Sequence, residues 1–222
     1  MKRLFLVAAT LVFGSATFAQ TTTTTPSTST TRFGLKGGVN LPKYKYVNDE
    51  ENTSTDSKST VNFNLTGYAD IPVGSYFSVQ PGISLQGKGG KISDDGENNK
   101  VEDNVLSIEI PVNLLANLPA GPGHFYLGGG PYAGFNIAGQ RKTTLLGVEQ
   151  PEEDLKFGKD SEDDLKALDF GINVLAGYQF SSGFNVGAGY GFGFTNLVPT
   201  SDSDTNGEIN NRLWSFTVGY AF

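Results

Sequence analysis

Apolar residues alternate with small or polar residues in segment after segment of this chain, and this pattern limits its fold more than any other. The last segment shows it most clearly: Trp214, Phe216, Val218, Tyr220 and Phe222 share one face, with small or polar residues between them. A period of two residues is that of a β-strand, whose successive side chains point to opposite sides. The chain is therefore expected to end on a strand with one apolar face.

The same alternation occurs in seven earlier segments, each close to the about 9–11 residues that a tilted strand needs to cross a membrane. The expected strands cover 33–41, 62–71, 77–86, 106–114, 125–137, 168–180, 184–195 and 214–222. Short connections near 73–75, 117–122 and 181–182 alternate with long ones near 42–60, 89–104, 140–166 and 196–210. Short periplasmic turns and long outer loops are typical of membrane barrels. The sequence thus predicts an all-β fold, an eight-stranded antiparallel up-and-down transmembrane β-barrel over 32–222, with both termini periplasmic.

The charged residues give this alternation a direction. Of the 23 acidic residues, 20 lie in the four long loops, and the other three lie on the polar face of a strand. No charge lies mid-strand on the apolar face, where a Lys or Arg at the centre of a bilayer would cost about 2–4 kcal/mol. A soluble barrel would turn its apolar face inward and carry many charges outside. We therefore expect the apolar face to contact lipid and the polar face to fill a narrow lumen.

The inward charges are expected to pair, because a buried charge needs a partner. Lys88 and Glu109 flank the second long loop on adjacent strands, and Lys36 and Asp70 could pair nearer the periplasmic end. With Asp169, these residues form the expected lumen charge network. An eight-stranded barrel has an interior just wide enough for side chains. The hypothesis is a plugged barrel, not an open pore.

The N-terminal segment predicts export followed by a tether. A basic start at Lys2 precedes an apolar run over 4–13 that is too short to span a bilayer. Small residues follow, and we place signal-peptidase cleavage after Ala19. Residues 1–19 are thus expected to be a signal peptide, and 20–31, mostly Thr and Ser, a flexible tether.

Short motifs follow one another along 32–222. They are RFGLKGGVN at 32–40, FSVQP at 77–81, GKG at 87–89, IEIPV at 108–112, GGGPY at 128–132, DFG at 169–171, TN at 195–196 and the final Phe222. Their order and spacing resemble the outer-membrane β-barrel domain family common in Bacteroidetes, which includes PorT-like proteins. The resemblance implies an eight-stranded barrel inserted by the outer-membrane assembly machinery, which reads an aromatic C-terminal residue, here Phe222. It implies no particular activity.

Catalytic and metal-binding chemistry finds little support. The only His, His124, lies in a short connection at the predicted periplasmic end, and a lone turn His is usually structural. Asp202, Asp204 and Asn206 match the front of an EF-hand loop, but Leu213 stands where the closing Glu is needed. An Asx-rich hairpin loop is the simpler interpretation. We predict no enzyme and no cofactor, and only a weak calcium candidate at these three residues.

Three functions remain open at this point. The first is a structural or interaction barrel that displays four long acidic extracellular loops to an unknown ligand, since loops on a rigid scaffold often bind. The alternatives are porin-like transport of small solutes and a soluble periplasmic barrel that binds an apolar ligand. Expected partners are outer-membrane lipid, lipopolysaccharide and the assembly machinery. Loss of two basic residues with the signal peptide takes the net charge from −7 to −9, which argues against nucleic acid.

Overall fold

The computed structural model describes residues 30–48, 53–94, 99–160, 162–199 and 207–222. The expected signal peptide, most of the tether and the calcium candidate at Asp202, Asp204 and Asn206 lie outside these residues. Within the described part, no helix is both long and apolar enough to span a membrane.

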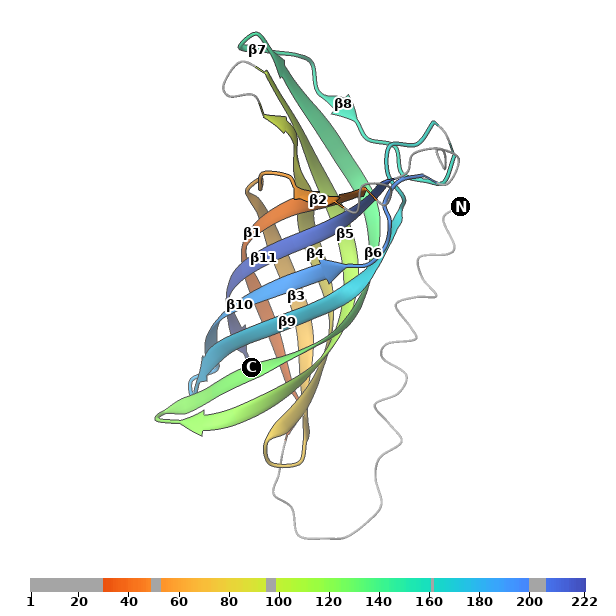
Figure 1. Ribbon diagram of the computed structural model, residues 1–222. Coiled ribbons are helices and arrows are strands. Elements are labelled where there is room, and N and C mark those ends of the chain that lie inside the picture. The colour runs from red at the N-terminus through yellow and green to blue at the C-terminus, as the bar shows by residue number, and fades with distance from the viewer. Residues whose placement is uncertain (1–29, 49–52, 95–98, 161, 200–206) are drawn as a thin grey trace, which may run out of the picture.

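Eight long strands form a closed barrel (Figure 1). They are β1 (Arg32–Asn48), β3 (Asn62–Val73), β4 (Phe77–Asp94), β5 (Asn99–Ala120), β6 (Gly123–Leu145), β9 (Leu168–Phe180), β10 (Phe184–Gly193) and β11 (Gly207–Ala221). Each pairs antiparallel with the next along the chain, and β11 pairs with β1 to close the ring, with Leu35 opposite Tyr220 and Leu41 opposite Trp214. This confirms the predicted eight-stranded antiparallel barrel.

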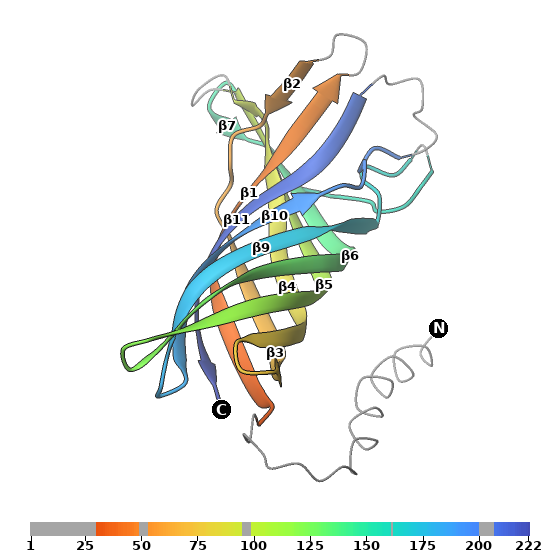
Figure 2. The same cartoon turned by 60° about the horizontal axis from the view of Figure 1, so that its bottom comes forward.

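The two ends of the barrel differ in their connections. At one end, Gly74, Gly121 and Gly183 each adopt a positive φ in a tight turn, a conformation that side chains disfavour. We call this the short-turn end, and Arg32 and Ala221 lie there too (Figure 2). The opposite, long-loop end carries three further short strands: β2 (Thr53–Asp56), β7 (Val148–Glu149) and β8 (Glu153–Asp154).

The barrel turns its apolar face outward. The side of the strands that carries Phe, Leu, Ile and Val is exposed, as at Leu127, which is 57% exposed. The opposite face is buried and mostly polar, with Asn40, Ser107 and Asp169 each 0% exposed. Because this is the reverse of a soluble protein, it confirms the predicted direction of the apolar face.

The long loops are shorter than the sequence indicated. β1 continues to Asn48 and β6 to Leu145, while β5 begins at Asn99 and β11 at Gly207, all within the regions predicted as loops. The reason is that the apolar alternation ends where lipid contact ends, although the hydrogen-bonded ladder continues. A register shift between Leu106 and Ser107 also exchanges the two faces of β6 beyond that point.

Candidate functional site

A charge cluster joins opposite sides of the lumen. Lys88 on β4 forms an ion pair with Glu109 on β5, and its Nζ lies 2.7 Å from Asp169 Oδ2 on β9. All three side chains are buried. The structure therefore brings together three of the five residues of the expected lumen network.

Neutral side chains complete this cluster. Asp169 Oδ2 also accepts hydrogen bonds from Asn211 Nδ2 at 2.9 Å and from Tyr132 OH at 3.3 Å. The Lys88 ammonium lies 4.8 Å from the centre of the Tyr132 ring, within the range of a cation–π contact. Residues of β4, β5, β6, β9 and β11 thus meet at one point. We refer to Lys88, Glu109, Tyr132, Asp169 and Asn211 as the lumen cluster.

The other expected pair does not form. Lys36 Nζ donates to Gln80 Oε1 at 3.2 Å, and no ion pair joins it to Asp70 in the described part of the chain. The register explains this, because Thr66 lies opposite Lys36 while Asp70 lies opposite Arg32. Four residues along a strand separate the two positions by roughly 13 Å.

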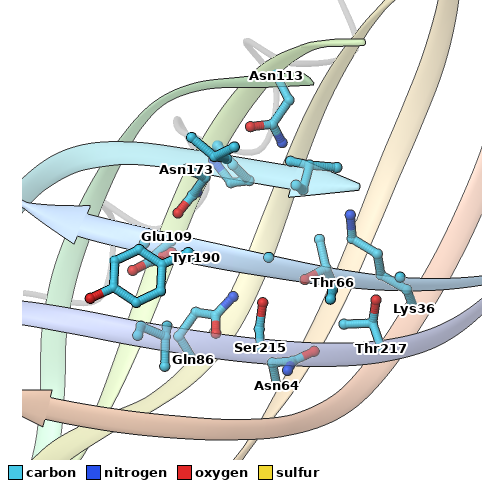
Figure 3. Close-up of a pocket in the computed structure, with 18 of the residues that line it drawn as sticks. Lys36, Asn64, Thr66, Gln86, Glu109, Asn113, Asn173, Tyr190, Ser215 and Thr217 are labelled. Carbon is cyan, nitrogen blue, oxygen red and sulfur yellow. The ribbon is translucent and has the colours of Figure 1, made fainter. Parts of the chain in front are cut away.

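Side chains fill most of the remaining lumen. One cavity of about 70 Å³ is lined by residues that include Lys36, Asn64, Glu109 and Asn173 (Figure 3). A second cavity of about 10 Å³ lies beside Asp70 and His124. Since one water molecule needs roughly 10–15 Å³ of cavity volume, these spaces suit a few waters and not a wide aqueous channel.

Apolar residues close the barrel at the long-loop end. Leu155, Leu165 and Leu197 come from the connections that follow β8 and β10, and they pack on Tyr44 of β1 and Val105 of β5. We call these five residues the loop cap. Backbone hydrogen bonds hold it in place: Leu155 N donates to Gly139 O at 2.9 Å, and Leu197 N to Ile209 O at 2.8 Å. The connection after β8 is therefore folded onto the mouth of the barrel.

An arginine fork anchors the loop cap to β5. Arg141 Nε and Nη2 donate to the two carboxylate oxygens of buried Asp103 at 2.8 and 3.0 Å, and Nη1 reaches Asp164 at 3.3 Å. The hydrogen bonds to Asp103 raise the pKa of the Arg141 guanidinium above its usual value. Bidentate pairing fixes orientation as well as charge, so the fork sets the position of the segment that carries Asp164.

The hairpin of β6 and β7 ends in an apolar turn above the loop cap (Figure 1). Leu145 pairs with Val148, and the two residues between them, Leu146 and Gly147, have φ values of 52° and 77°. Two positive φ values are the pattern of a type I′ turn, which favours Asn-Gly. A leucine in this conformation costs about 1–2 kcal/mol.

The other predicted site residues lie apart from these features. Phe222 exposes its ring at the short-turn end, and its backbone N donates to Phe33 O at 2.7 Å. His124 was expected in a short connection, but it lies within β6, opposite Gln179. Within the described ranges, no group of three or more His, Asp or Glu residues is arranged to hold a metal ion.

Sequence reasoning missed both the loop cap and the apolar turn. Both lie in stretches that were interpreted as acidic loops. The available signal was the isolated leucines in those stretches, namely Leu145, Leu146, Leu155, Leu165 and Leu197. The residues that pack on these leucines come from distant strands. The sequence could therefore indicate that the leucines are buried or make a contact, but not which residues they pack against.

A closed antiparallel barrel with an apolar outer face and a polar, filled interior defines the class of membrane-spanning β-barrels. The chain matches the family model described as "Outer membrane protein beta-barrel domain" over residues 18–198. It belongs to that family and is a small β-barrel of the outer membrane.

Comparison with solved structures gives distant likenesses. Ail, the attachment invasion locus protein of Yersinia pestis, is 13% identical with a TM-score of 0.42, covering 86% of this chain and 98% of Ail. Neisserial surface protein A is 13% identical with a TM-score of 0.42, covering 86% of this chain and 97% of its own. The translocator domain of the autotransporter NalP from Neisseria meningitidis is 14% identical with a TM-score of 0.29, covering 85% and 88%. No curated protein sequence matches the chain significantly.

Proposed function

We propose that this protein is a plugged outer-membrane barrel that displays a folded surface to partners outside the cell. The observation that carries the proposal is the contrast between its two parts. The lumen is crossed by the lumen cluster, whereas the long-loop end is built into an ordered cap and a projecting hairpin. Porin-like transport fits poorly with this blocked interior. An apolar ligand, as in a soluble periplasmic barrel, fits poorly with its polar lining.

The orientation follows from the connections. Short turns face the periplasm and long connections face outward in barrels of this kind. In the proposed orientation, the loop cap and the β6–β7 hairpin lie outside the cell, and Phe222 lies on the periplasmic side. Export by a signal peptide at 1–19, cleaved after Ala19, with a tether at 20–31, is part of the proposal. The motifs beginning at Arg32 favour the PorT-like Bacteroidetes group within the family.

The proposed partners differ between regions. The outward aromatic side chains would contact lipid and lipopolysaccharide. Trp214 is one of them, and the centre of its ring lies 4.8 Å from that of Tyr190. The assembly machinery would read Phe222 during insertion. The extracellular ligand would bind at the long-loop end, and neither a catalytic activity nor a cofactor forms part of the proposal.

Conductance in planar bilayers tests the plug. We expect no stable channel from the wild type, and steady current only when Lys88→Ala, Glu109→Ala and Asp169→Ala are combined, because truncation empties the lumen. The matched control is Lys88→Met with Glu109→Gln and Asp169→Asn, which removes the charges but keeps most of the volume and should stay closed. A conducting wild type would refute the plug and favour porin-like transport.

Labelling of intact cells tests the orientation. The chain contains no Cys, so Leu146→Cys introduces a single thiol. A membrane-impermeant maleimide should label it from outside, whereas Gly121→Cys, at a short turn, should react only after the outer membrane is opened. Labelling of Gly121→Cys alone on intact cells would reverse the orientation.

A further inference from the structure

We infer that the end of the β6–β7 hairpin binds a protein or peptide partner that presents an apolar surface flanked by cationic side chains. This end, which we call the hairpin tip, consists of Leu145, Leu146 and Val148. The inference deepens the proposed function and rests on it, since the tip must lie outside the cell.

The hairpin tip is apolar and exposed to solvent. Leu145, Leu146 and Val148 are 50%, 84% and 61% exposed. The β6–β7 hairpin that carries them projects beyond the mouth of the barrel (Figure 1), so lipid contact does not account for them. Contiguous apolar side chains exposed to water commonly mark interaction sites.

The backbone of the turn does not explain the leucine. Leu146 has a φ of 52°, in the left-handed region where Asn or Gly is favoured. The leucine makes the turn less stable than Asn would. Because its side chain is almost fully exposed, packing within this chain offsets little of this destabilisation. Backbone strain at an exposed residue indicates that its side chain serves a contact with another molecule and not the stability of the fold.

The two faces of the hairpin have different characters. Leu145 lies on the same face as Gly139, where an added Cβ would come within 3.0 Å of the Leu155 side chain in the loop cap. This face, which also carries Arg141 and its pair with Asp103, therefore looks across the mouth of the barrel, with the apolar residues at its outer end. The opposite face carries two further ion pairs and none of the apolar tip residues, with Lys100 2.8 Å from Glu102 and Lys142 3.0 Å from Glu152.

The charges around the tip specify a cationic partner. Three cations near it, Lys100, Arg141 and Lys142, are each paired with a carboxylate, and a fourth, Lys91, lies opposite Glu102. Glu149 is exposed next to Val148, and Glu153 and Asp154 are exposed farther down the hairpin, opposite Arg141 and Gln140; no ion pair joins these three residues to a cation in the described part of the chain. This negative excess attracts cationic side chains and repels anionic lipid and nucleic acid. An apolar surface flanked by Lys or Arg is the complementary chemistry.

A defined peptide provides the test. The probe is a fluorescein-labelled amphipathic peptide of leucine and lysine, titrated by anisotropy against the full chain in phosphatidylcholine nanodiscs, with empty nanodiscs as the reference. Leu146→Asn should weaken binding on the order of 10- to 100-fold, the effect of losing one buried leucine at an interface. Because Asn suits the left-handed turn, the hairpin should persist. Leu146→Met should restore binding, and Val61→Thr, an exposed valine elsewhere at the long-loop end, should leave it unchanged.

Three results would overturn the inference. One is equal affinity for wild type and Leu146→Asn, which would leave charge alone as the cause. Another is Leu146-dependent attachment to added phosphatidylcholine vesicles, which would make the partner a membrane. The third is self-association of the wild type that Leu146→Asn abolishes, which would make it a second copy. Failure of the proposed function is distinguished by Leu146→Cys, since a thiol that is not labelled from outside refutes the exposure of the tip itself.

Discussion

Replacing Lys88 by Met should destabilise the barrel more than removing the whole charge cluster. Lys88 lies between Glu109 and Asp169, and all three side chains are buried. The substitution leaves two carboxylates facing each other without a cation. Breaking a buried ion pair from one side costs about 3–5 kcal/mol, whereas replacing every charge with a neutral residue of similar size is often close to neutral. The triple variant with Lys88→Met, Glu109→Gln and Asp169→Asn should therefore recover most of the loss.

Denaturant unfolding in lipid vesicles measures this difference. Trp214 is the only tryptophan and faces outward from β11, so its emission reports transfer between lipid and water. The unfolding midpoint of Lys88→Met should fall clearly below that of the wild type at neutral pH, and the triple variant should lie near the wild type. Acidification should reduce the difference in unfolding midpoint between Lys88→Met and the wild type, because protonation of the two carboxylates removes the uncompensated charges. A triple variant as unstable as the single one would show that packing, and not charge compensation, holds the cluster.

Two further substitutions test the loop cap, and a third tests the assembly signal. Arg141→Ala leaves buried Asp103 without its fork, so limited proteolysis of the segment 150–167 should accelerate while heat-dependent gel mobility stays the same. Gly139→Val places a side chain where Phe157 Cζ would lie 2.8 Å from the new Cβ, so it should release the cap in the same assay, and an unchanged cleavage rate would contradict the packing. Phe222→Ser should lower the yield of inserted barrel in cells. It should change the free energy of unfolding of the inserted protein by no more than about 1 kcal/mol, because the backbone hydrogen bond to Phe33 remains.

The membrane-spanning part was predictable because lipid imposes a strict period of two. Every wall residue must face either lipid or lumen, so the positions of Phe216 and Val218 fix the alternation of their strand. The outer extensions were not predictable on this basis. The register shift at Leu106 exchanges the faces of β6, and side chains above it meet water or the cap instead of lipid.

The site was only partly predictable for a related reason. Lys88 and Glu109 lie on adjacent strands that flank the second long loop, and this placement suggested their pairing. Asp169 was placed inside by its alternation, but its contact with Lys88 depends on barrel closure. The pairing of Lys36 with Asp70 was wrong because the offset between β1 and β3 is set by the whole ladder, and alternation determines the face and not the offset.

The lumen cluster also bears on the order of events during assembly. Lys88 and Glu109 come from neighbouring strands and can neutralise each other as soon as that hairpin forms. Lys88 and Asp169 are 81 residues apart, and β5 and β6 must be in place before β9 can bring them together. Until then, Asp169 carries a charge that stays hydrated. Contacts between distant parts of a chain form slowly, so the incomplete barrel must keep water in its interior until its last strands dock, and expulsion of that water becomes a late step of insertion.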